Sequence, residues 1–93
     1  MSKKDIQITF EPPLVFHGQE KSTVVIREPK VKDMRAVDQI SGSDLEKEMV
    51  MICRLSGINE EDLDTLSVNE YKQLQEAYAG FFGMGGPSSD VSA

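Results

Sequence analysis

Apolar and polar residues alternate at the start of the chain, and this pattern predicts a β-strand. Ile6, Ile8 and Phe10 are each separated by one polar residue, which is the period of a half-buried strand. The two prolines at 12–13 interrupt this strand, because proline cannot donate to a β-ladder and restricts the residue before it. We therefore expect an extended segment that is broken once and then resumes.

A second strand is predicted by residues 22–27, whose β-branched content gives the clearest strand pattern in the chain. Residues 17–20 supply the turn between the two strands. The first third of the chain, about residues 5–27, is thus predicted to form a short antiparallel β-hairpin. Two strands alone are only marginally stable in water, so we expect this sheet to pack against helices or another subunit.

The pattern becomes helical after residue 30, and three to four helices are expected over residues 31–82. Met34, Val37 and Ile40 are spaced three residues apart and share one face of the first helix. The serine and glycine at 41–42 end this helix.

The other helices are marked by capping residues. Ser43 and Ser67 each precede a glutamate by three residues, and in this arrangement a hydroxyl and a carboxylate satisfy unpaired N–H groups at a helix start. Gly57 is well placed to end the helix that begins after Ser43. Asn59 precedes three acidic residues, which suit the positive end of the dipole of a short third helix.

The second helix is apolar around most of its circumference, so we expect it to be buried on several sides. Cys53 is the only cysteine; it cannot form an internal disulfide, and its neighbours indicate a small buried side chain. The main stripe comprises Leu45, Met49, Ile52 and Cys53, and the apolar residues outside it are Val50, Met51 and Leu55.

The last helix, from about residue 68 to 82, carries more bulky apolar side chains than a minimal core stripe. Most of them are expected to form the core, but Phe81 and Phe82 occupy the last turn beside a glycine-rich exit, where a thin core buries them poorly. Exposed aromatic patches mark interaction sites, and methionine adds adaptable surface. The candidate partner-binding residues are Tyr71, Leu74, Tyr78, Phe81, Phe82 and Met51.

Together these patterns predict an α+β fold, a hairpin followed by helices, in one small domain over residues 1–82. Residues 83–93 are rich in Gly, Ser and Pro without periodicity and are predicted to form a flexible tail.

The chain has a formal net charge of −6, and this charge is unevenly distributed. Residues 1–35 carry seven Lys and Arg against five Asp and Glu, whereas residues 36–93 carry three against eleven. An acidic helical region repels phosphate backbones, which argues against a nucleic-acid partner. The acidic excess either keeps the helical surface soluble or steers a basic partner, and charge alone does not decide between the two.

The sequence contains no arrangement of residues that is typical of an enzyme. His17 is the only histidine and lies in a predicted turn, which excludes a histidine-dependent triad and a two-histidine metal pair. The acidic residues at 60–64 lack the spacing of a calcium-binding loop and are ordinary for a helix start. We therefore expect no catalytic activity, no cofactor and no metal site.

Two further classes are disfavoured. A glycine turn at 55–58 has the outline of a helix-turn-helix, but the second helix would bring four carboxylates and no basic residue into a major groove. No run approaches the roughly 18 apolar residues of a membrane span, and the polar N-terminus lacks a signal core. We expect a cytoplasmic protein that does not bind membranes.

Several short motifs follow one another in a defined order. A strand that ends in Arg-Glu-Pro at 27–29 leads to a helix, and Leu-Ser-Gly follows at 55–57. Asp-Leu-x-x-Leu is present at 62–66 and Tyr-x-x-Leu-Gln at 71–75. Their order and spacing resemble those of the small tail assembly chaperones of Mu-like and P2-like bacteriophages, over roughly residues 6–83.

This resemblance implies a helper protein that is made during phage tail construction and is absent from the virion. Such chaperones coat the long, helical tape-measure protein, prevent its aggregation and deliver it to tail-tube subunits. We therefore expect helix-in-groove binding of the tape-measure protein, with the tail-tube protein as a further partner and self-association left open.

Members of this family often exist in two lengths through programmed frameshifting. We hypothesise that a slippery U-run encodes Phe81 and Phe82, because phenylalanine codons begin with UU. A gene without a slippery heptamer before the stop codon would exclude this hypothesis.

Two other functions remain open at this point. The first is a virion component, such as a tail-completion or connector subunit, which purified particles would contain. The second is an acidic regulatory protein that mimics DNA, whose mark would be salt-sensitive binding to a basic host protein.

Overall fold

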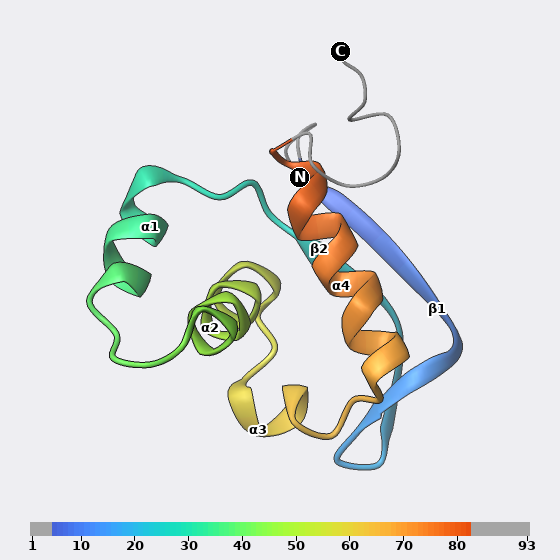
Figure 1. Cartoon of the computed structure of the whole chain (residues 1–93). Coiled ribbons are helices and arrows are strands. Elements are labelled where there is room, and N and C mark those ends of the chain that lie inside the picture. Colours follow the sequence, from blue (N-terminus) through green and yellow to red (C-terminus); the bar gives the residue numbers. More distant parts are fainter. Residues whose placement is uncertain (1–4, 83–93) are drawn as a thin grey trace.

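The computed structural model describes residues 5–82 and has the predicted α+β architecture (Figure 1). Within this range a two-stranded antiparallel sheet precedes four helices. The strands are β1 Ile6–Phe16 and β2 Gln19–Ile26, and the helices are α1 Val31–Asp38, α2 Asp44–Ser56, α3 Glu60–Leu63 and α4 Val68–Gly80. The tail predicted at 83–93 lies outside the described residues. No helix of the described part is long and apolar enough to cross a membrane.

The hairpin has regular pairing at its two ends and a register shift between them. Pairing runs from Ile6 opposite Ile26 to Thr9 opposite Thr23, and it resumes at Leu14. The shifted segment contains the two prolines, whose missing N–H groups cannot join the ladder. The predicted interruption is therefore present, and β1 continues through it to the turn.

One face of the hairpin lies under the helices and forms the centre of the core. Figure 1 shows α4 running along the sheet, and α2 also packs against β2. Burial under these helices supplies the stabilisation that an isolated hairpin lacks. The buried residues at this junction are Phe10, Leu14, Val24 and Ile26 of the sheet, Ile52 of α2 and Leu74 of α4.

α2 begins and ends where the sequence predicts. Ser43 Oγ accepts a hydrogen bond from the Glu46 N–H at 3.1 Å, and Gly57 has a φ of +81°, which glycine adopts without a steric penalty. Leu45 differs from the expected stripe, since it is 52% exposed in the first turn, at the edge of the core. The helix is otherwise enclosed on several sides, with Met51, Ile52, Cys53 and Leu55 all buried.

α1 lies against α2, on the opposite side from α4 (Figure 1). Its inward face is set by Asp33 and Val37, which are four residues apart and both buried. Met34 is rotated about 100° from Asp33 and is 55% exposed, while Ile40 lies beyond the helix end and is partly buried. The apolar face predicted for this helix is therefore only partly used in the fold.

α4 begins with a complete capping box. The Glu70 N–H donates to Ser67 Oγ at 3.1 Å, and the Ser67 N–H donates to Glu70 Oε1 at 2.9 Å. The helix ends at Gly80, two residues earlier than predicted. Phe81 and Phe82 form a turn in which each N–H donates to the carbonyl three residues before it.

Candidate functional site

One side of α4 carries a row of large side chains that the core does not fully cover. These residues follow one another at intervals of three or four, so they share one side of the helix and of the turn after it. Val68 is 72% exposed and Phe82 47% exposed, and the three residues between them are partly exposed. We call this row the α4 strip; it consists of Val68, Tyr71, Gln75, Tyr78 and Phe82.

The strip is anchored to α2 through Glu48. Glu48 Oε1 accepts hydrogen bonds from the Tyr71 hydroxyl and from the Gln75 amide, both at 2.8 Å. Burial and the Glu48 carboxylate hold the pKa of Tyr71 well above its usual range, and the same two causes raise the pKa of Tyr78. The Tyr71 hydroxyl therefore stays protonated near neutral pH and acts as a hydrogen-bond donor to Glu48.

Tyr78 and Phe82 form the aromatic end of the strip. Their ring centroids are 5.3 Å apart with an interplanar angle of 82°, which is an edge-to-face arrangement. Phe81 is partly buried and packs against the core. Phe82 therefore carries the most exposed phenylalanine or tyrosine ring in the described part of the chain.

A shallow apolar pocket of about 170 Å³ lies at the N-terminal end of the strip. It forms where α3 and the start of α4 meet α2, and Asp64 is its one charged residue. The pocket is smaller than the sites that enclose small-molecule ligands, but it has room for one or two apolar side chains of a partner. We call it the α3–α4 pocket; it is lined by Met49, Leu63, Asp64, Leu66, Ser67, Val68 and Tyr71.

The structure divides the six predicted partner-binding residues into two groups. Leu74 is 0% exposed and Met51 is 4% exposed, so neither side chain offers surface to a partner in this fold. Leu74 is an apolar residue of α4 like its neighbours in the strip, but its side chain lies on the side of the helix that is buried against the core. The other four lie together on α4 and the turn after it and keep exposed surface; they are Tyr71, Tyr78, Phe81 and Phe82.

Three residues of this surface were not identified from the sequence. Val68 is the most exposed member of the strip, although it is an apolar residue at helical spacing from Tyr71. Gln75 could have been found, because it lies between Tyr71 and Tyr78 at helical spacing. Glu48 gave no sequence signal, since its role depends on contacts more than 20 residues away.

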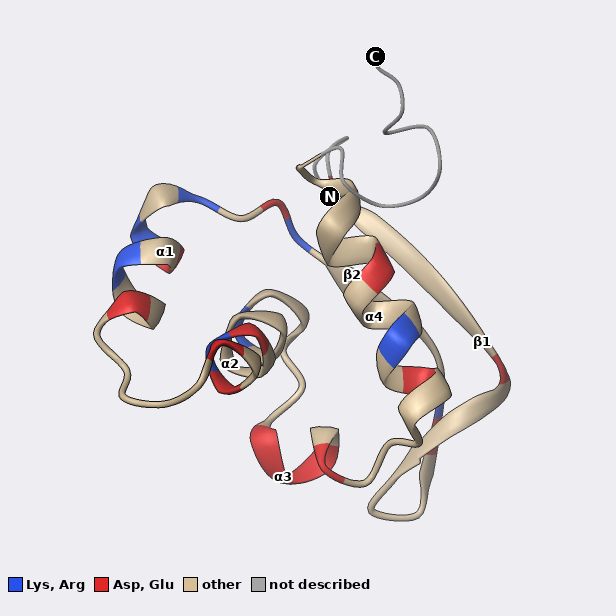
Figure 2. Ribbon diagram, viewed as in Figure 1, with Lys and Arg blue, Asp and Glu red and all other residues tan. Residues whose placement is uncertain are grey.

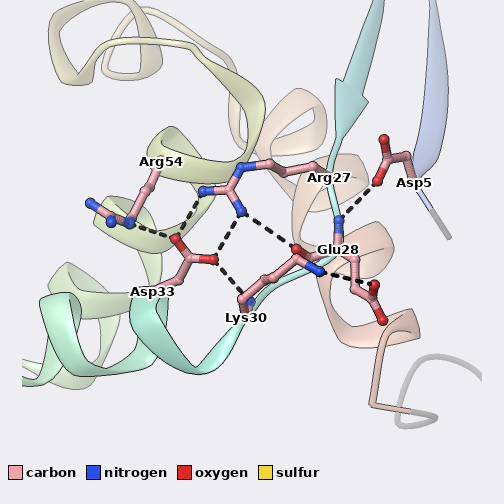
Figure 3. Close-up of polar contacts among 6 residues, drawn as sticks. All are labelled: Asp5, Arg27, Glu28, Lys30, Asp33 and Arg54. Carbon is pink, nitrogen blue, oxygen red and sulfur yellow. Dashed lines mark hydrogen bonds and ion pairs between the residues drawn. The ribbon is translucent and has the colours of Figure 1, made fainter. Parts of the chain in front are cut away.

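An ionic cluster around Asp33 was also missed (Figure 3). The Asp33 side chain is completely buried, and both its oxygens accept hydrogen bonds from Arg27, at 2.8 and 2.9 Å. Arg54 Nε donates at 2.7 Å and the Lys30 N–H at 2.9 Å. These donors, Arg27 first among them, hold the pKa of Asp33 well below its usual range despite burial. The cluster joins the end of β2, α1 and α2.

The charged side chains are unevenly distributed over the described elements (Figure 2). α1 and the segment before it carry both signs, whereas α3 carries only acidic charges. Within α3, Asp62 is paired with His17 of the hairpin turn at 2.9 Å, and Glu60 and Glu61 are exposed. The α3–α4 pocket therefore lies beside an acidic helix. Among the residues that the structure describes, no cluster of three potential ligands could hold a metal ion.

Comparison with known proteins identifies the family. Residues 7–83 match the family described as phage tail assembly chaperone proteins, E, or 41 or 14. No curated protein and no solved structure gives a significant match. The matched residues span the hairpin and the four helices, including the whole α4 strip. The chain therefore belongs to the family of phage tail assembly chaperones.

Proposed function

We propose that this protein binds the tape-measure protein of its phage during tail assembly, through the α4 strip. In this role it keeps the tape-measure protein from aggregating and then yields it to tail-tube subunits. It acts by binding and not by catalysis, works in the cytoplasm of the bacterial host, and is left out of the finished virion.

The observation that carries this proposal is the row of partly exposed aromatic side chains along α4 in a member of this family. A long helical client exposes apolar helix faces before it is packed into a tail, and such faces aggregate if they are left uncovered. A helix laid along α4 would cover the strip from Val68 to Phe82, a length of about 20 Å at 1.5 Å per residue.

The chemistry of the strip suits reversible binding. Tyr71 and Gln75 are already fixed by Glu48, so they lose little side-chain entropy when a client binds. The area that one helix face can bury is also smaller than the area of the interfaces of permanent complexes. A contact of this size can be released when another protein competes for the client.

Co-expression with the tape-measure protein of the same phage tests this function. Phe82→Ser removes an exposed ring at the end of the strip, and Val15→Ser is a matched control because Val15 is 56% exposed on β1, outside the strip. We expect Phe82→Ser to lower the amount of soluble tape-measure protein several-fold and Val15→Ser to leave it unchanged. Equal amounts with the wild type and both variants would contradict the proposal.

The protein content of purified virions tests the second part of the proposal. A chaperone that is released during assembly should be missing from particles that contain the tape-measure and tail-tube proteins. Its presence in stoichiometric amount would favour the alternative function as a virion component.

A further inference from the structure

The outer side of α1 carries apolar side chains that the described residues 5–82 leave exposed. Val31 is 67% exposed and Met34 is 55% exposed, and together with Arg35 and Asp38 they line an open hollow on this side of the helix. Lys32 is exposed beside them. The one large apolar side chain that α1 adds to the core is Val37.

α1 is nevertheless held firmly in place. Asp33 on its inner side is paired with Arg27, at the end of β2, and with Arg54 of α2 (Figure 3). A helix of eight residues is not stable alone, so these ion pairs fix both its presence and its direction. Because the cluster holds Asp33 on the inner side of α1, Val31 and Met34 lie on the outer side, where a partner can contact them.

The charge and shape of the outer side of α1 indicate the chemistry of a partner that would fit it. The exposed Lys32 and Arg35 outnumber the exposed Asp38, so this side of α1 keeps a net positive charge that favours an acidic surface. The two apolar side chains need an apolar recess. The α3–α4 pocket of the same protein offers both features. Its walls are mostly apolar, Asp64 lines it, and α3 beside it carries the exposed carboxylate of Glu61.

α1 cannot reach this pocket in its own chain, because α2 lies between α1 and α4 (Figure 1). We propose that α1 of one copy docks into the α3–α4 pocket of a second copy. The two surfaces are different patches, so the contact is head to tail and continues from copy to copy. It covers Val68 and Tyr71, which line the pocket, and leaves Tyr78 and Phe82 free. If the proposed function holds, a row of copies could therefore bind one long client together through the aromatic ends of their strips.

Sedimentation equilibrium of the purified protein, with no phage partner present, tests this contact. We expect the average mass to rise above the 10.3 kDa of one chain as concentration increases. It should fall back when NaCl is raised from about 50 to about 500 mM, because salt screens the charged rim. A wild type that stays monomeric at every concentration at low salt would overturn the proposal.

Two charge-reversed variants test which surfaces meet. The α1 variant carries Lys32→Glu and Arg35→Glu, and the pocket variant carries Glu61→Lys and Asp64→Lys. Each variant alone should remain monomeric, because like charges then face each other across the contact. An equal mixture should associate again, since each reversed surface meets an opposite one.

A symmetric contact of α1 with α1 gives a different outcome. In that case the pocket variant alone would associate like the wild type, because its α1 is unchanged; this result would overturn the proposal. Met34→Ser provides a check that leaves every charge in place, and it should weaken association without changing the circular dichroism spectrum. Because no client is present, these measurements stand apart from the test of tape-measure binding.

Discussion

Asp33 and Arg27 form a two-pronged ion pair in which both guanidinium amino groups donate to a carboxylate that is fully buried. Arg54 shares one of the two carboxylate oxygens. The cost of burying this charge is offset because every acceptor direction is used, including one that receives the Lys30 N–H. Three elements of the fold meet at this one side chain.

We predict that Asp33→Ala lowers the free energy of unfolding by about 2–4 kcal/mol. Removing the carboxylate leaves the guanidinium groups of Arg27 and Arg54 close together without the negative charge between them. Their partial exposure to water keeps the loss below that of a fully buried pair. Urea denaturation followed by circular dichroism measures this change. Asp38→Ala is the matched control, because Asp38 is exposed on the same helix and should change stability by less than about 0.5 kcal/mol. Equal effects from the two substitutions would contradict the role of the cluster.

The same cluster predicts how stability depends on pH. The pKa of Asp33 lies below its ordinary value of 3.8, so the unfolded chain binds this proton first as pH falls. The stabilisation from Asp33 is therefore fully present above about pH 5 and is lost as pH falls below about 4. The difference in unfolding free energy between the wild type and Asp33→Asn, measured from pH 7 to pH 2, should stay constant at first and then shrink. A difference in unfolding free energy that grows as the pH falls would contradict this prediction.

The elements of this fold were predictable because their signals are local. The alternation from Ile6 to Phe10, the capping pair of Ser67 and Glu70, and the glycine at position 57 each act within a few residues. The ends of the helices were harder to predict, and α4 ends two residues earlier than expected. Helix ends fray, and their exact terminal residue is set by weak local signals.

The ionic cluster and the orientation of α4 were not predictable, because they depend on contacts between distant parts of the chain. Asp33 and Arg54 are 21 residues apart, and Tyr71 and Glu48 are 23 residues apart. The sequence predicts a wide apolar side of α4, but it does not say which part of that side faces the sheet. The structure buries Leu74 and leaves the strip partly open.

Cys53 should react slowly with thiol reagents in the folded protein. Burial, together with the negative charges of Glu60 and Asp64, raises the pKa of its thiol to about 11. The thiolate fraction at pH 8 is then about a hundredfold smaller than for an ordinary thiol. The rate of reaction with DTNB at pH 8 should rise at least that much in denaturing urea. Similar rates with and without urea would show that Cys53 is accessible.

Leu74→Ala should act on stability and not directly on client binding. Leu74 is 0% exposed in the core, and its truncation is expected to cost about 2–4 kcal/mol of unfolding free energy. Thermal unfolding should show a lower midpoint, and client binding should recover when the temperature is lowered enough to refold the variant. A folded Leu74→Ala variant that fails to bind its client would place Leu74 in the interface after all.

Photo-crosslinking from position 82 tests the proposed function most directly. Replacing Phe82 with p-benzoylphenylalanine keeps an aromatic group at the exposed end of the strip, and the same replacement at Val15 places the probe on β1. In cells that produce the tape-measure protein, we predict a crosslink to it from position 82 and none from position 15. No crosslink from position 82, or equal crosslinks from both positions, would contradict binding through the α4 strip.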